Sequence, residues 1–203
     1  MNVLLAGGAG FIGSHTAAEL LIAGHDVFVI DNLSNSYKTA LDGPEKLSKK
    51  KIVFHETDLR DYQSVLKFSR DKRIDAIIHL AGFKSVGESV LDPVAYFDNN
   101  LIPTINLCKL VEELGVKNFV FSSSATVYGN PAKMPIEESF STSEALSPYA
   151  ESKVINETIL KALEVLRSDL NVVSLRYFNP AGAHPSGLIG EASRHRATNL
   201  IPV

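Results

Sequence analysis

Several features that would each indicate a class of protein are missing from this 203-residue sequence. It has a single cysteine, Cys108, which excludes an intrachain disulfide and fits a reducing compartment. No apolar run approaches the roughly 18 residues that a membrane helix needs, and the N-terminus has no basic region followed by an apolar run, as a signal peptide would. We therefore predict a soluble, cytoplasmic protein that does not bind membranes.

The sequence also lacks a charge excess and a metal-binding pattern. Lys and Arg number 20 against 23 Asp and Glu, and the only basic cluster, residues 49–51, is typical of a solvated loop. The six histidines form no H-E-x-x-H or related pattern, and His79 lies in an apolar run that predicts a hydrogen-bonded core residue. The sequence thus predicts neither a nucleic-acid partner nor a metal site.

What the sequence does contain is an alternation of short apolar runs with helix-like stretches. The runs are nearly continuous in apolar residues, which is typical of parallel strands covered by helices on both faces. We predict an α/β fold, a doubly wound and mostly parallel sheet of the Rossmann type, over residues 1–180. The predicted strands are Val3–Ala6, Val27–Ile30, Ile52–His55, Ala76–Leu80, Phe119–Ser122 and Val172–Leu175, and the predicted helices are Phe11–Ala23, Pro93–Leu114 and Tyr149–Arg167.

The long predicted helix that begins at Pro93 has an apolar face at helical spacing. This face carries Leu101, Ile105, Cys108, Val111 and Leu114. We predict that it packs on the sheet, so that Cys108 is a core residue rather than a reactive thiol.

A glycine-rich segment follows the first predicted strand and opens the first helix. Its glycines at positions 8, 10 and 13 give the pattern G-x-G-x-x-G. Such glycines allow a tight turn and let a pyrophosphate approach the helix N-terminus, where free N–H groups face the anion. The pattern predicts a dinucleotide site that includes Gly7, Gly10, Phe11, Ile12 and Gly13.

An aspartate at the end of the second predicted strand indicates which dinucleotide binds. Asp31 is placed to accept hydrogen bonds from both ribose hydroxyls and to repel a 2′-phosphate, which favours NAD over NADP; the alternative is that it caps a turn with Asn32. After the third strand, Asp58 and Leu59 are predicted to lie at the adenine, although Asp58 could equally cap a helix. The fourth strand ends in small residues where the protein backbone must approach the cofactor, followed by a lysine that could meet the pyrophosphate: Leu80, Ala81, Gly82 and Lys84.

Three polar residues predict proton chemistry at the same edge of the sheet. Tyr149 and Lys153 are four residues apart and share one helix face, and Ser124 follows the fifth strand. A lysine ammonium and a positive nicotinamide would lower the phenol pKa from about 10 toward neutrality, which needs roughly 4 kcal/mol. Tyr149 would then accept a proton from a substrate hydroxyl as a hydride leaves for the nicotinamide.

Taken in order, these residues carry a resemblance that covers essentially the whole chain. The sequence resembles the extended short-chain dehydrogenase/reductases and, among them, the UDP-glucose (UDP-galactose) 4-epimerase family. The matching segments are residues 7–16, 31–36, 81–89, 98–100, 121–129, 149–153 and 176–187.

The resemblance implies an NAD-dependent epimerisation at carbon 4 of a UDP-hexose through a transient 4-keto sugar. Tyr149 would abstract the proton of the 4-hydroxyl, Ser124 would relay or stabilise it, and Lys153 would hold the nicotinamide ribose. Further cofactor contacts are implied at Asn32, Leu33, Ser34, Asn35, Ser36, Phe83, Asn99, Ser122 and Phe178. The implied UDP-sugar side includes Ser124, Tyr149, Lys84, Tyr177, Asn179, Asn199 and Leu200.

Other functions stay open within this resemblance. The related sugar-nucleotide 4,6-dehydratases use an acid pair directly after the residue that ends strand five, where this chain has Ala125 and Thr126, which favours an epimerase. An epimerase for a UDP-N-acetylhexosamine or a UDP-pentose is one alternative. A non-catalytic NAD-binding module is another.

The resemblance finally implies a longer protein that forms a homodimer. We expect residues 181–203 to begin a truncated substrate-binding region, and the 203 residues alone to bind NAD with little turnover. We also expect exposed apolar surface around Ile189 and residues 200–203, which would favour self-association.

Overall fold

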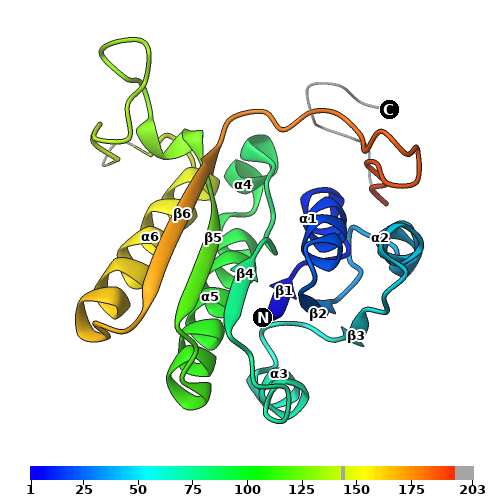
Figure 1. Ribbon diagram of the computed structural model, residues 1–203. Coiled ribbons are helices and arrows are strands. Elements are labelled where there is room, and N and C mark those ends of the chain that lie inside the picture. Colours follow the sequence, from blue (N-terminus) through cyan, green and yellow to red (C-terminus); the bar gives the residue numbers. More distant parts are fainter. Residues whose placement is uncertain (143–144, 195–203) are drawn as a thin grey trace.

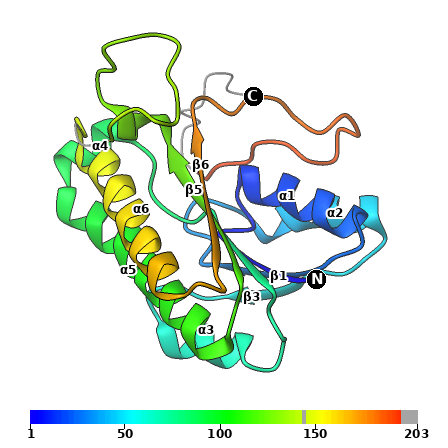
Figure 2. The ribbon, with the colours of Figure 1, turned by 60° about the vertical axis from the view of Figure 1, so that its left-hand side comes forward.

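The computed structural model describes residues 1–142 and 145–194, and its centre is a six-stranded sheet in the order β3-β2-β1-β4-β5-β6 (Figures 1 and 2). All neighbouring strands pair in parallel. This order, with β1 and β4 adjacent at the centre, confirms the predicted doubly wound Rossmann-type sheet. The strands are β1 (Asn2–Ala6), β2 (Asp26–Asp31), β3 (Val53–Glu56), β4 (Ala76–His79), β5 (Asn118–Ser124) and β6 (Asn171–Tyr177).

Helices cover both faces of the sheet, as Figure 2 shows. On one face, α1 and its neighbour α2 cover β1 and β2, and on the other α3, α5 and α6 cover the sheet. The helices are α1 (Phe11–Ile22), α2 (Asp42–Ser48), α3 (Tyr62–Ser69), α4 (Val86–Leu91), α5 (Pro93–Leu114) and α6 (Pro148–Leu166), with short 3-10 helices η1 (Lys38–Leu41) and η2 (Ala125–Tyr128).

The predicted elements are all present, with ends that differ from the prediction by at most two residues. Strand β5 extends to Ser124 and β6 to Tyr177, because these polar residues continue the backbone ladder of Ser122–Leu175 and Ser124–Tyr177 pairs beyond the apolar run. Strand β4 ends at His79 rather than Leu80, α1 ends one residue early, and α6 begins at Pro148 and ends at Leu166. Proline fits the first turn of a helix, where its missing N–H would have no partner.

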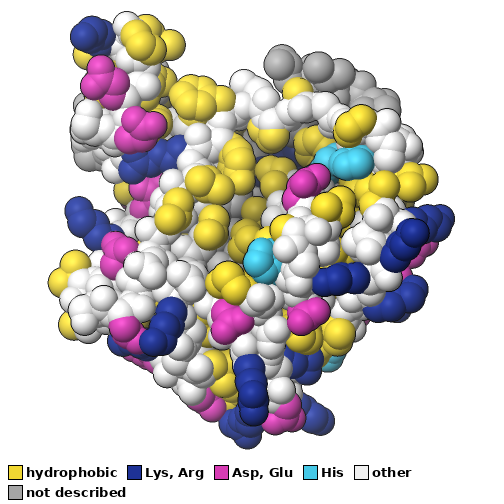
Figure 3. Space-filling model, viewed as in Figure 1, with side chains coloured by type: hydrophobic (Ala, Val, Ile, Leu, Met, Phe, Trp, Pro, Cys, Tyr) yellow, Lys and Arg dark blue, Asp and Glu magenta, His cyan; other side chains and the backbone are white. Residues whose placement is uncertain are grey.

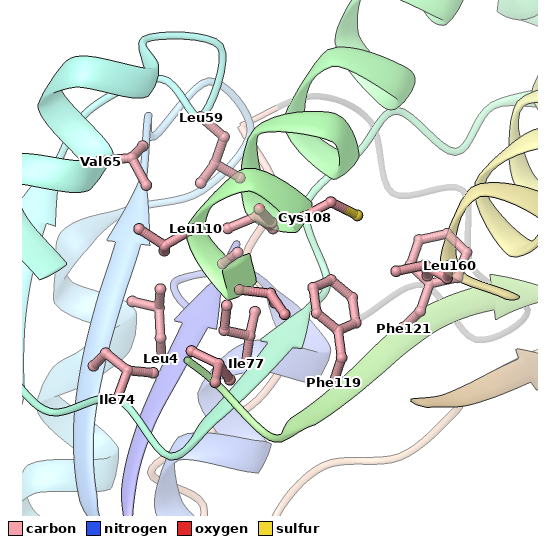
Figure 4. Close-up of a cluster of buried hydrophobic side chains, with 14 of the residues drawn as sticks. Leu4, Leu59, Val65, Ile74, Ile77, Cys108, Leu110, Phe119, Phe121 and Leu160 are labelled. Carbon is pink, nitrogen blue, oxygen red and sulfur yellow. The ribbon is translucent and has the colours of Figure 1, made fainter. Parts of the chain in front are cut away.

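The larger of two hydrophobic cores lies between the sheet and α3, α5 and α6 (Figure 4). Phe119 and Phe121 of β5 are fully buried there, with Ile77 of β4 below α5 and Leu160 of α6 beside Phe121. The smaller core, between the sheet and α1, contains Val3, Leu5, Ala17, Leu21, Val27 and Val29.

The buried face of α5 differs from the predicted one. Ile105 is 39% exposed and Leu101 is half-buried, whereas the neighbouring polar residues Asn100 and Thr104 are buried. Polar side chains can occupy the interior when they are hydrogen-bonded. Thr104 does so with the Nε2 of His79, 3.1 Å away, and Asn100 makes the bonds described below.

Two interior residues predicted from the sequence behave as core groups. Cys108 is buried, and burial raises the pKa of its thiol to about 12, so it does not act as a reactive thiol at neutral pH. His79 is buried in β4, and burial lowers the pKa of its imidazole to about 3. Its Nδ1 has no hydrogen-bond partner among the described residues, so the prediction of a hydrogen-bonded core histidine holds for one nitrogen only.

Removing a large core side chain should show how far the fold depends on the larger core. Phe119→Ala is expected to lower the free energy of unfolding by about 3–5 kcal/mol, because it leaves a cavity between the sheet and α5. Leu166→Ala, at a residue 81% exposed, should change it by no more than about 0.5 kcal/mol. Urea unfolding of both variants measures the difference, and equal losses would contradict this account of the core.

Candidate active site

The glycine loop between β1 and α1 lies at the carboxyl edge of the sheet, where a close backbone approach requires glycine. Gly7 has a φ of +82°, and a Cβ there would lie 2.6 Å from the backbone nitrogen of Ala81. A Cβ on Gly13 would lie 2.5 Å from the carbonyl oxygen of Gly7. Gly10 is the N-cap of α1 and provides no side chain to the first amides of the helix. The loop therefore leaves these N–H groups available to an anion.

Asp31, at the end of β2, is hydrogen-bonded to the glycine loop. Its Oδ2 accepts from the amide of Ala9 at 3.0 Å, and its Oδ1 accepts from the amide of Leu33 at 2.9 Å and from the hydroxyl of Ser36 at 3.0 Å. The carboxylate thus caps the turn after β2, as the alternative interpretation expected, and also lies against the glycine loop. These two contacts fix its orientation beside the loop.

Next to this turn, Asp58 belongs to a network of hydrogen bonds and ion pairs. Its carboxylate accepts from the side-chain amide of Asn32 at 3.1 Å and pairs with Arg60, whose NH2 lies 2.8 Å from Oδ2. Hydrogen bonds from Arg60 hold the pKa of Asp58 at about 2. Arg60 also pairs with Asp98 of α5. The N-cap of α3 is Asp61, so the helix-cap alternative for Asp58 is wrong.

The serine, tyrosine and lysine predicted for proton chemistry converge at the same carboxyl edge of the sheet, beyond β5. The side chain of Ser147 caps α6 by accepting from the amide of Ala150 at 3.1 Å, which places Tyr149 in the first turn. Ser124, at the end of β5, lies close enough to Tyr149 to lower the pKa of its phenol. One turn further along α6, the ammonium of Lys153 lies 5.8 Å from the centre of the Tyr149 ring.

The electrostatics of this group are set mainly by burial. Burial raises the pKa of Tyr149, although Ser124 lowers it. Lys153 is not among the groups that shift the pKa of Tyr149. Its ammonium is buried and donates instead to the carbonyl oxygen of Ser122 at 2.8 Å, and burial lowers the pKa of Lys153 itself to about 8. The combined effect of Lys153 and a positively charged nicotinamide on the pKa of Tyr149 stays a prediction.

An ion pair behind this group was not predicted from the sequence. Arg176 of β6 donates to Glu157 of α6 from Nε at 3.0 Å and from NH2 at 2.7 Å. Ser123 of β5 also donates to Glu157, and Arg176 donates to the hydroxyl of Tyr128 at 2.8 Å. The pair joins α6 to the ends of β5 and β6. The available signal was that Glu157 lies four residues after Lys153, on the same helix face.

A second unpredicted residue, Asn100 of α5, joins the loop after β4 to α6. Its Oδ1 accepts from the amide of Phe83 at 2.8 Å, and its Nδ2 donates to the carbonyl oxygen of Phe83 at 3.1 Å and to the hydroxyl of Ser152 at 3.0 Å. Asn99 donates to the same Oδ1 at 3.1 Å. A polar residue on the buried face of a long helix is the signal that could have identified it.

The other predicted residues occupy the same edge with different exposure. Phe83 and Phe178 are 40% and 63% exposed, and burial raises the pKa of Tyr177. Figure 3 shows apolar side chains gathered over this edge of the molecule. Half-buried or exposed there are Phe11, Ile12, Asn32, Ser34, Asn35, Leu80, Ala81, Gly82, Lys84, Ser122 and Asn179, whereas the side chains of Leu33, Ser36 and Leu59 are buried. Asn199 and Leu200 lie outside the described residues.

Within residues 1–142 and 145–194, no group of three or more His, Cys, Asp or Glu side chains is placed to hold a metal ion. Over the same ranges, no helix is long and apolar enough to cross a membrane.

The sequence pattern of the NAD-dependent epimerase/dehydratase family matches residues 3–202. The chain belongs to this family. The chain is 48% identical over 202 residues to the UDP-glucose 4-epimerase of Bacillus subtilis. The matched region covers 100% of the chain and 59% of the relative. The chain is also 47% identical to the UDP-glucose 4-epimerase uge1 of Schizosaccharomyces pombe, covering 99% of the chain and 58% of the relative. The chain thus spans less than two thirds of the length of these curated relatives.

Solved structures of family members have the same fold. The UDP-glucose 4-epimerase of Bifidobacterium longum, in complex with NAD+ and UDP, superposes with a TM-score of 0.96 at 44% identity, over 98% of this chain and 60% of that one. The enzyme of Stenotrophomonas maltophila, with bound NAD and formylated UDP-arabinopyranose, gives a TM-score of 0.93 at 43% identity, over 98% and 59%. These findings confirm the resemblance seen in the sequence.

The buried ammonium of Lys153 should reduce the stability of the folded protein. We expect Lys153→Met to raise the free energy of unfolding at pH 7 by about 1–3 kcal/mol, because an apolar side chain of similar length avoids the desolvation cost. Lys161→Met, at an exposed lysine of the same helix, is the control and should change little. A variant at position 153 less stable than the wild type would contradict this prediction.

The same substitution has an expected pH dependence. Because burial lowers the pKa of Lys153 from 10.5 to about 8, the unfolded chain binds one more proton than the folded chain between these values. The free energy of unfolding of the wild type, relative to that of Lys153→Met, should therefore rise as the pH goes from about 8 to 10.5. Below pH 8, the difference in free energy of unfolding between the two proteins should be constant. Urea unfolding at a series of pH values measures it.

Proposed function

We propose that the protein containing this chain interconverts the carbon-4 epimers of a UDP-hexose, UDP-glucose and UDP-galactose, by transient oxidation to a 4-keto sugar with NAD as the oxidant. The observation that carries the proposal is the meeting of Ser124, Tyr149 and Lys153 at the edge that also bears the glycine loop and Asp31. Relatives at 47–48% identity named UDP-glucose 4-epimerase support it.

The residues at this edge fit NAD. The positions of Gly7 and Gly13 leave no space for a Cβ, as expected where a loop must keep its backbone close to the pyrophosphate. Asp31, hydrogen-bonded to Ala9, carries a negative charge beside the loop, which favours ribose hydroxyls over a 2′-phosphate. Bound NAD would accept a hydride from carbon 4 of the sugar and return it to the opposite face. Asp58, Leu59, Asn99 and Phe178 are proposed as further contacts with the cofactor.

A chain of hydroxyl groups supports a proton-transfer role for Tyr149. The hydroxyl of Thr126 donates to the Oγ of Ser124 at 3.0 Å, which leaves the Ser124 proton to be donated to the phenol oxygen. That hydrogen bond lowers the pKa of Tyr149 against the effect of burial. We assign to Tyr149 the acceptance of the sugar 4-hydroxyl proton, and to Lys153, protonated at pH 7, the stabilisation of the resulting phenolate and the binding of the nicotinamide ribose.

The same segment supports epimerisation over dehydration. Ser124 is followed in η2 by Ala125 and Thr126, neither of which carries a carboxyl group for an elimination step. The sugar-nucleotide side is proposed to be formed by Lys84, Ser124, Tyr149, Tyr177, Asn179, Asn199 and Leu200. We further propose a cytoplasmic homodimer for the full-length protein, which the exposed Ile102 and Ile105 of α5 support.

Changing Asp31 should alter cofactor preference. The wild-type chain is expected to bind NAD more tightly than NADP, and Asp31→Ser should reduce this preference by about tenfold or more, because the carboxylate that repels a 2′-phosphate is lost. Ser36→Ala removes one hydrogen bond to Asp31 but keeps the charge, so its preference should stay with NAD. Calorimetric titration of both cofactors measures this. Equal affinity of the wild type for the two would contradict the role of Asp31.

Removing the Tyr149 hydroxyl should stop proton transfer without loss of the cofactor. In the full-length protein, Tyr149→Phe is expected to lower the 4-epimerase rate by roughly 100- to 10,000-fold, the range for losing a general base. Tyr62→Phe, at a tyrosine of α3 whose hydroxyl donates to Glu113, is the matched control and should keep wild-type turnover. The assay follows formation of UDP-glucose from UDP-galactose. Near wild-type turnover of the Tyr149 variant would exclude this residue as the base.

A further inference from the structure

The segment after β6 runs back across the carboxyl edge of the sheet to α1 and α2 (Figures 1 and 2). We call its described part, residues 182–194, the strap. An amide–carbonyl bond of 3.1 Å from His184 to Ile189 closes a turn within it. Ile189 is only 5% exposed, whereas its neighbour Leu188 is 49% exposed, so the expected apolar surface around Ile189 is present at Leu188 but not at Ile189 itself. The side chain of Ile189 packs at a defined place in the fold.

That place is the first turn of α2. A Cβ on Gly43 would lie 2.3 Å from the carbonyl oxygen of Leu188 and 2.8 Å from the side chain of Ile189. Both are shorter than real Cβ contacts, so the strap touches the backbone of α2 only because position 43 is glycine. The strap also contacts α1, because the Nε2 of His184 lies 3.9 Å from the Oε1 of Glu19.

The C-terminal half of the strap is attached to both loops that flank the glycine loop. On the β2 side, the Nε of Arg194 donates to the carbonyl oxygen of Ser36 at 2.8 Å, and its guanidinium lies 4.9 Å from the centre of the Tyr37 ring. On the β4 side, the buried carboxylate of Glu191 lies 4.0 Å from the ammonium of Lys84. The strap therefore spans the edge between the two loops.

We propose that the strap retains the bound dinucleotide, so that NAD leaves at the rate at which the strap detaches from α2. This inference rests on the proposed function. Ser36, whose carbonyl oxygen accepts from Arg194, is also hydrogen-bonded to Asp31 at the proposed ribose position. Lys84, which faces the Glu191 carboxylate, is the lysine predicted for the pyrophosphate. Both ends of the cofactor site are thus joined to one segment, and Gly43 is the residue that allows this segment to dock.

Gly43→Ala is the variant that tests the docking without damage to the fold. Position 43 lies inside α2 and has no left-handed φ, and alanine is favoured over glycine within a helix by up to about 1 kcal/mol. The helix itself should tolerate the change, whereas the Leu188 carbonyl must move away. Gly87→Ala in α4 is the matched control, since a Cβ there meets nothing within 4 Å.

The experiment measures NAD release from the 203-residue chain by displacement of labelled NAD with excess unlabelled NAD. Gly43→Ala is expected to release NAD about tenfold faster or more, with a smaller effect on the association rate, and Gly87→Ala to match the wild type. Hydrogen exchange of peptides from residues 182–194 is the second readout. NAD should slow exchange there in the wild type, and Gly43→Ala should exchange faster.

The outcomes separate this inference from the function on which it rests. Suppose that the wild-type chain binds NAD and that the Gly43→Ala variant releases it at the wild-type rate. This result would overturn the proposed role of the strap and leave the proposed function intact. The proposal would also be overturned if NAD did not change the rate of hydrogen exchange in peptides from the strap. A wild-type chain that does not bind NAD would contradict the proposed function and this inference with it.

Discussion

The close approach of the loop after β1 to the loop after β4 is the constraint on which the site depends. Strands β1 and β4 are neighbours at the centre of the sheet, and their connections leave in opposite directions, which opens the carboxyl edge between them. The two loops meet where Gly7 lies against the backbone of Ala81. Because no side chain separates them, the free amides of α1, the Asp31 carboxylate and the loop held by Asn100 face one region.

Buried polar groups then fix α6, which carries Tyr149 and Lys153, to this edge. Asn100 binds both backbone groups of Phe83 and the hydroxyl of Ser152, so the loop after β4 and α6 cannot separate without breaking these bonds. The Glu157–Arg176 pair joins α6 to β5 and β6 from the other side. Burying such polar groups costs free energy, and their effect is to fix the orientation of the elements that they join. The buried Lys153 belongs to the same set, since burial disfavours its charged form and lowers its pKa to about 8.

The sequence was sufficient to predict the order of strands and helices, because parallel strands covered on both faces are nearly continuous apolar runs. It also predicted that the glycine loop, Asp31 and the serine, tyrosine and lysine lie at one edge of the sheet, since each follows a strand or opens a helix there. It could not predict the Tyr149 pKa, which depends on burial and on where the Lys153 ammonium points. Nor could it predict the contact of Gly43 with the strap, because the two are brought together only by the fold.

The most direct test of a cofactor site at the carboxyl edge is a map of backbone amide shifts by NMR on the labelled 203-residue chain as NAD is added. The account predicts that the amides of Gly10, Leu33 and Phe83 shift together at one concentration of NAD, because they surround one ligand. Shifts confined to other surfaces, such as the hollow on α3 between Gln63 and Asp71, or no shifts at all, would contradict it.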